Sequence, residues 1–141
     1  MKASGVPPTI LVPMDDRQMP ESALEQIANE ARSSGSKILL MGIVPVHLYN
    51  PSEEELAEVR QATITAVRSA AAELGRRGIV AEEMLTTGYP DEEIINRAEE
   101  LEVSLIVIPF TKDRPSELKK AASIILDEDR TVNIPILHVP V

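Results

Sequence analysis

Apolar runs of strand length alternate along this chain with longer segments that have the periodicity of helices. The runs at 9–13, 37–46, 103–110 and 134–139 are continuously apolar, which is typical of parallel strands covered on both faces. The run at 79–86 contains Glu82 and Glu83 and is predicted to be an edge strand. The strand-length runs are Thr9–Pro13, Lys37–Val46, Ile79–Thr86, Val103–Phe110 and Ile134–Val139.

The segments between these strands carry helix start and stop signals. The first helix is predicted to begin after Pro20 and to end at Gly35. Ser52 and Glu55 form a capping box for a long second helix, which we expect the glycines at 75 and 78 to end. A third helix starts at Pro90 with acids in its first turn, and a fourth covers about 115–126.

This alternation of strands and helices predicts a fold of class α/β. Right-handed crossovers would give one parallel sheet with helices on both faces, which is a three-layer domain. The 141 residues suit one domain spanning 1–141, and no internal repeat or interdomain linker is evident.

Composition narrows the kinds of partner. Net charge is −9 and aromatic residues make up 2% of the chain, so phosphate backbones and anionic membranes are repelled and base-stacking platforms are absent. We therefore expect no nucleic-acid and no membrane partner. No cysteine is present, which excludes disulfides and thiolate chemistry. The first residues show no signal-peptide or membrane-spanning pattern, and we expect a cytoplasmic protein.

Two apolar strands end abruptly in polar residues. The first runs into Met14-Asp15-Asp16, and the strand at 105–109 runs into Phe110-Thr111-Lys112. In an open α/β sheet, ligands bind at the carboxyl ends of such strands. The second strand, however, ends in a proline and a lysine, where a phosphate-holding turn would need glycines.

Several segments stand in a characteristic order and spacing. They are Ile10-Leu11-Val12-Pro13-Met14-Asp15, then Gly88, Pro90, Ile94, Ile95 and Ala98, then Leu105-Ile106-Val107, and finally Pro135-Ile136-Leu137-His138-Val139. In the order and spacing of these segments together, the chain resembles the universal stress proteins over nearly its whole length.

The resemblance implies a five-stranded parallel sheet of the adenine nucleotide α-hydrolase-like type, commonly in a homodimer joined through the last strand. Such pairing would also cover the apolar edge at 134–141. Some members of that family bind ATP through a glycine-rich loop after the fourth strand. Laid on this chain, the loop glycines fall on Pro109, Lys112 and Ala122, so none is retained, while Ser123 keeps its residue type and Ser104 replaces an aspartate.

The loss of these glycines changes the chemistry of the loop. Glycine lets backbone N–H groups approach phosphate oxygens, whereas Pro109 has a fixed φ and no N–H to donate. Lys112 costs roughly 1 kcal/mol if its position is left-handed, and its ammonium can meet a phosphate. The predicted site is thus a degenerate nucleotide site, formed by Asp15, Ile43, Pro109, Thr111, Lys112 and Ser123.

Two readings of this site follow. In the first, the chain is a stress-response binding or regulatory protein that is neither a standard ATP binder nor a dedicated enzyme, and needs no cofactor. In the second, it is a nucleotide-binding sensor or slow ATPase that holds ATP or another adenine nucleotide with Asp15, Thr111, Lys112 and Ser123 in a rearranged loop. Asp15 can equally cap the turn that follows it, and Ile43 can be a core residue.

Other chemistries have less support. Asp15 and Asp16 could hold Mg²⁺ as in phosphoacceptor receiver domains, but the strand ending near Gly88 supplies no acceptor aspartate. His47 and His138 lack metal-ligand spacing, so no metal site is predicted. No serine lies in a Gly-x-Ser-x-Gly elbow, and neither a Gly-x-x-x-x-Gly-Lys loop nor a Gly-x-Gly-x-x-Gly loop occurs.

Overall fold

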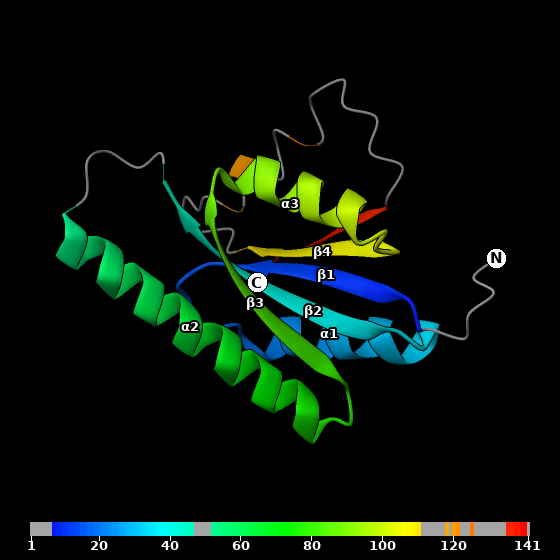
Figure 1. Ribbon diagram of the computed structural model, residues 1–141. Coiled ribbons are helices and arrows are strands. Elements are labelled where there is room, and N and C mark those ends of the chain that lie inside the picture. The colour runs from blue at the N-terminus through cyan, green and yellow to red at the C-terminus, as the bar shows by residue number, and fades with distance from the viewer. Residues whose placement is uncertain are drawn as a thin grey trace.

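The computed structural model describes residues 7–46, 52–110, 118, 120, 121, 125 and 135–140, with backbone alone for 110 and 137–140. Its strands form one five-stranded parallel sheet in the order β3-β2-β1-β4-β5 (Figure 1). The elements along the chain are β1 (Thr9–Met14), α1 (Glu21–Ser34), β2 (Lys37–Pro45), α2 (Glu53–Arg76), β3 (Ala81–Gly88), α3 (Pro90–Glu100), β4 (Leu105–Phe110) and β5 (Ile136–Pro140).

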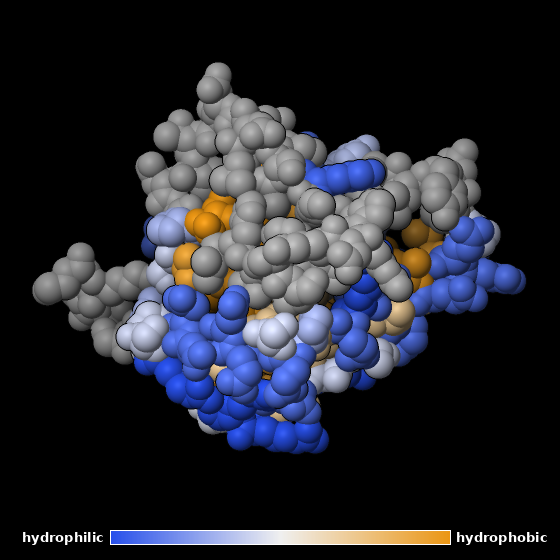
Figure 2. All heavy atoms as spheres, turned by 180° about the vertical axis from the view of Figure 1, so that it is seen from behind, coloured by the Kyte–Doolittle hydropathy of each residue, from blue (hydrophilic) through white to orange (hydrophobic). Residues whose placement is uncertain are grey.

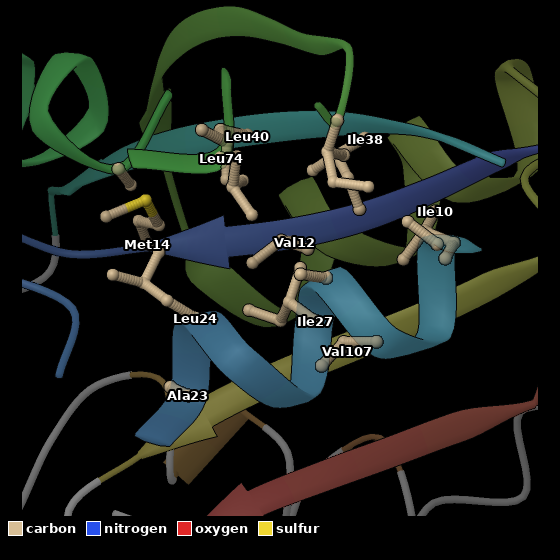
Figure 3. Close-up of a cluster of buried hydrophobic side chains, with 14 of the residues drawn as sticks. Ile10, Val12, Met14, Ala23, Leu24, Ile27, Ile38, Leu40, Leu74 and Val107 are labelled. Atoms are coloured by element: carbon tan, nitrogen blue, oxygen red, sulfur yellow. The ribbon is translucent and has the colours of Figure 1, made fainter. Parts of the chain in front are cut away.

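Helices α1 and α2 cover one face of the sheet. Alternate residues of β1 and β2, including Val12 and Leu40, point into a buried cluster with Ile27 of α1 and Leu74 of α2. In Figure 3 the side chains of Leu24 and Ile27 on α1 point toward Val12 and Met14 on β1. This layer forms because every second side chain of a strand points to the same face of the sheet, where it packs against the apolar stripe of a helix.

Helix α3 covers the opposite face. Leu11, Met41 and Ile108 from three strands pack there with Ile94 and other residues of α3. Leu118, Ala121 and Ile125 are helical and belong to the same cluster, whereas the rest of the predicted helix at 115–126 lies outside the described residues. The predicted three-layer α/β arrangement with helices on both faces is confirmed.

Several predicted helix ends and the edge strand are also confirmed. Ser52 caps α2: its Oγ accepts from the Glu55 amide at 3.1 Å. Gly35 ends α1 in the left-handed conformation, with φ of 64°. β3 lies at the edge of the sheet, and Glu82 and Glu83 are exposed. The local rules for caps and edges thus hold here.

Other predicted boundaries are wrong by one or two residues. The third strand runs from 81 to 88 rather than from 79 to 86, because the Ile79 amide bonds the Leu74 carbonyl at the end of α2. The chain turns at Gly78, with φ of 77°, while Gly75 stays inside the helix. Val103 also precedes its strand, since its amide bonds the Ala98 carbonyl of α3. At the remaining ends, the first strand extends to 14, the second stops at 45 and the last runs from 136 to 140.

The outer surface is mostly polar where it is described. Seen from behind, hydrophilic side chains cover the lower part of the molecule, and hydrophobic atoms show in smaller patches (Figure 2). None of the helices in the described ranges has the length and apolar run needed to cross a bilayer.

Candidate functional site

The strand order reverses between β1 and β4, at the centre of the sheet. From β1 the chain moves by way of α1 to β2 and β3, and then crosses back over α3 to β4 on the other side of β1. In parallel α/β sheets, the carboxyl ends of the strands at this switch point form the ligand crevice. The structure therefore puts the candidate site at the carboxyl ends of β1 and β4 (Figure 1).

Pairing between these two strands stops early. β1 pairs with β2 as far as Met14↔Gly42, but with β4 only at Ile10↔Leu105 and Leu11↔Ile106. β4 in turn pairs with β5 from Ile106↔Ile136 to Phe110↔Pro140. We call the facing edges beyond the last pair, at 12–14 and 107–109, the β1–β4 seam.

Hydrogen bonds show which backbone groups face the seam. The Thr9 carbonyl accepts from Ser104 on the β4 side, whereas the Pro8 carbonyl accepts from Lys37 on the β2 side, both at 2.9 Å. Because backbone groups alternate between the two neighbouring strands, residue 13 also faces β4.

The same alternation applies to β4. The Ile106 amide donates to the Pro135 carbonyl on the β5 side at 3.0 Å. Residue 109, three positions further on, therefore faces β1.

Both seam-facing positions are occupied by proline. The next two ladder bonds would run from the amide of residue 13 to the Val107 carbonyl and from the amide of residue 109 to the Pro13 carbonyl. Neither can form, because Pro13 and Pro109 have no N–H. This explains why the pairing ends after Leu11↔Ile106. Sequence reasoning singled out Pro109 alone; a proline inside a central apolar strand was the signal that could have identified Pro13.

Asp15 lies just beyond β1, at the mouth of the seam, and is half-buried. Its Oδ1 accepts a hydrogen bond from the Arg17 amide at 3.0 Å, which is the turn-capping geometry. Burial raises the pKa of the Asp15 carboxyl, the neighbouring Asp16 adds to that rise, and the Arg17 amide opposes it.

Ile43 lies close to Asp15 in the sheet but belongs to the core. Since Met14 pairs with Gly42, Asp15 and Ile43 follow one position further on adjacent strands. The Ile43 side chain is 2% exposed and packs in the α3-side cluster. The structure thus brings Asp15, Ile43 and Pro109 to one edge of the sheet, whereas Thr111, Lys112 and Ser123 lie outside the described residues.

The same edge carries a further acid. The Glu93 carboxylate, in the first turn of α3, accepts from the Thr86 hydroxyl, and a Cβ at Gly88 would lie 2.9 Å from Glu93 Cγ. The carboxyl edge therefore presents oxygen acceptors and negative charge at the ends of both β1 and β3.

Other candidate positions contribute less. His47 lies outside the described residues. His138 is in β5, where it pairs in register with Ile108 of β4. In the described ranges no group of three or more acidic or histidine side chains is arranged to hold a metal ion. A hollow of about 250 Å³ lies elsewhere, between α2 and the edge strand β3, with Val67, Arg68 and Leu85 in its lining.

A model of the universal stress protein family matches residues 8–126. The chain belongs to the universal stress protein family. Among curated proteins no match was found. A universal stress protein family member from Burkholderia pseudomallei is 22% identical, with coverage of 94% of this chain and 96% of its own and a TM-score of 0.70. UspA from Lactobacillus plantarum is 16% identical, with coverage of 96% and 99% and a TM-score of 0.75. The Archaeoglobus fulgidus universal stress protein in complex with dAMP is 20% identical, with coverage of 95% and 97% and a TM-score of 0.67.

These likenesses support the universal stress protein fold over 94–96% of the chain. At such identities they show the fold alone, and function has to be argued from the site. The feature of the site from which function is argued is the pair of prolines on the two central strands.

Proposed function

We propose that this universal stress protein is a cytoplasmic, stress-related binding or regulatory module that does not grip a nucleoside triphosphate and is not a dedicated enzyme. The observation that carries the proposal is the β1–β4 seam, where Pro13 and Pro109 occupy the two backbone positions facing each other across the switch point.

A triphosphate needs backbone N–H groups or cations to hold its oxygens. At this seam the backbone offers carbonyl oxygens in their place, because proline has no donor. The half-buried Asp15 and the acidic first turn of α3 add negative charge to the same edge, and the net charge of −9 opposes an incoming polyanion. Each of these features weakens phosphate binding.

Titration calorimetry with ATP and Mg²⁺ tests the proposal. We expect no binding in the micromolar range for the wild-type protein. The matched variant Pro109→Gly restores the conformational freedom of a loop glycine at that position, so any gain in ATP affinity in this variant supports the role of proline. Micromolar affinity of the wild-type protein for ATP would contradict the proposal.

A second candidate is a nucleotide sensor or slow ATPase, favoured by the half-buried carboxyl of Asp15 beside Ile43 at the switch point. The similar Archaeoglobus fulgidus protein is described in complex with dAMP. In this reading Lys112, Thr111 and Ser123 complete the site. Lys112→Ala should then abolish nucleotide binding and phosphate release, and unchanged affinity in this variant would exclude the reading.

We further propose a homodimer formed through β5. This strand is an edge of the sheet, and the segment 134–141 is rich in apolar residues, so pairing with a second copy would cover an exposed edge. Sedimentation velocity should show a dimer for the wild-type protein and a monomer for Val139→Lys. A wild-type monomer would refute this mode of assembly.

A further inference from the structure

Strand β3 has a backbone edge that faces away from the sheet. It is the last strand on its side and pairs with β2 alone (Figure 1). The carbonyls of Val80 and Gly88 accept from amides on the β2 side, at 2.9 and 3.3 Å. Because backbone groups alternate between the two sides of a strand, the odd-numbered residues direct their N–H and C=O groups outward. These residues are Ala81, Glu83, Leu85 and Thr87, of which the last three are exposed.

The hollow of about 250 Å³ between α2 and β3 lies beside this edge, on the α2 face of the sheet. It is lined by Ile64, Val67, Arg68, Glu83, Met84 and Leu85. The Leu85 side chain points to this face, because its Cδ1 lies 3.3 Å from the Cβ position of Gly42, beside Val67. The charges of Arg68 and Glu83 offset one another, so the hollow fits an apolar side chain.

The opposite, α3 face of the same edge is acidic. Glu82 alternates with Leu85 and therefore points to the α3 face; its side chain is 56% exposed and pairs with Lys37 at 2.8 Å, which leaves lone pairs for a second cation. Further along the strand, the Glu93 carboxylate of α3 accepts from the Thr86 hydroxyl. Cationic side chains therefore fit this face, and the net charge of −9 attracts them from a distance.

The two charged positions also argue against a second copy of this chain as the occupant. Pairing β3 with another β3 would gather Glu82 and Glu83 of both copies along one ladder, and like charges on paired strands are destabilising. A strand that carries cations in place of these acids would instead gain from them.

We propose that the β3 edge binds an extended segment of a partner protein in which apolar residues alternate with lysine or arginine. The segment adds a strand to the sheet through the outward backbone groups of β3. Its apolar side chains enter the hollow, and its basic side chains lie toward Glu82 and Glu93. This surface is separate from the β1–β4 seam and goes beyond the proposed function, because it involves no nucleotide.

A synthetic peptide provides the test on the side of the partner. The probe is a capped peptide of alternating lysine and valine, as long as β3. Its control has the same composition with all lysines before the valines, so the charge is equal and the alternation is lost. In calorimetric titrations of the wild-type protein, we expect the probe to bind about tenfold more tightly than the control.

Backbone methylation of the probe tests strand addition itself. An added strand directs only alternate amides at β3, so N-methylation of all valines or of all lysines should abolish binding in one of the two peptides and spare it in the other. By NMR, the amides of Glu83, Leu85 and Thr87 should exchange more slowly when the probe is bound.

Two variants provide the test on the side of the protein. Glu83→Pro removes one outward N–H and spares the ladder toward β2, and it should lower the affinity for the probe about tenfold. Glu82→Gln should lower it about threefold, whereas Glu30→Gln on α1 changes the net charge equally and should leave the affinity unchanged.

The inference is overturned if the probe does not bind or binds no better than the control of equal composition. It is also overturned if neither methylated peptide loses binding, or if a folded Glu83→Pro variant keeps full affinity. If that variant does not fold, the methylated peptides decide on the wild-type protein alone. ATP binding has no bearing on these results, so they are independent of the test of the proposed function.

Discussion

The two edges of strand β1 differ in how far they are hydrogen bonded. Toward β2 the ladder is complete to Met14, and toward β4 it ends at Leu11, although both neighbours are parallel and buried. The difference arises from single backbone donors, since the β2-facing positions of β1 keep their N–H and the β4-facing position 13 does not. A strand in the centre of a sheet can thus be fully hydrogen bonded to one neighbour and only partly to the other, at the end of the sheet where ligands bind.

The largest expected effect comes from adding a proline one residue before Pro13. Val12 is fully buried and its backbone faces β2, so Val12→Pro would remove a donor from the complete ladder. We expect a loss of about 3 kcal/mol or more in the free energy of unfolding, measured by urea denaturation. Val12→Ala is the control for the lost side chain. Equal stability of the two variants would mean that the ladder toward β2 matters no more than the seam.

The next effect concerns the contact of α2 with β2. A Cβ at Gly42 would lie 2.7 Å from Thr63 Cγ2 and 2.9 Å from Val67 Cγ2. Gly42→Val should therefore cost about 1–3 kcal/mol of unfolding free energy by overpacking. Gly75→Ala is the control, because nothing lies within 4 Å of its Cβ position in helix α2, and it should stabilise the protein by about 0.5 kcal/mol. A stable Gly42→Val variant would show that this layer can shift.

A smaller effect with a defined pH dependence is expected at the mouth of the seam. Because burial raises the pKa of Asp15 in the folded protein, its ionisation opposes folding above the pKa of the unfolded chain, and this cost is complete above the folded pKa. Asp15→Asn should be more stable than wild type at pH 7, with the difference vanishing as the pH falls below the ordinary aspartate range. Urea unfolding across this range measures it. A variant less stable than wild type at pH 7 would show that the carboxylate is held by favourable contacts.

The smallest effect is expected from the charge cluster that joins α1 to α2. Arg77 bonds Glu21, Glu25 (3.0 Å) and Glu73 (3.3 Å), and these hydrogen bonds and charges raise the pKa of the guanidinium, the contact with Glu25 most. Arg77→Gln should lower the melting temperature slightly, and less so in high salt because surface charges are screened. A salt-independent loss would point to packing of the arginine stem.

Much of the scaffold could be predicted from local patterns. The continuous apolar runs identified buried parallel strands, Ser52 and Gly35 marked helix ends, and Glu82 with Glu83 marked the edge strand. The predicted boundaries were wrong where a backbone group hydrogen bonds to a neighbouring element, as the Ile79 amide does to the Leu74 carbonyl at the end of α2. Periodicity carries no information on such competition.

The candidate site was only partly accessible to sequence reasoning. Pro109 was recognised as lacking a donor, because this follows from the residue type alone. That Pro13 opposes it could not be recognised, since the direction of each backbone group depends on register, and register is fixed by packing between strands distant in the chain.

The sequence by itself determined which residues are apolar, which positions lack an amide hydrogen and where chain direction changes, because these are properties of residue types and their spacing. Only the tertiary structure decided that β1 and β4 are neighbours, that their proline positions face one another and that Asp15 lies at the mouth of the gap between them. The physical reason is that strand order and register are chosen by the burial of two apolar faces at once, which no local segment encodes.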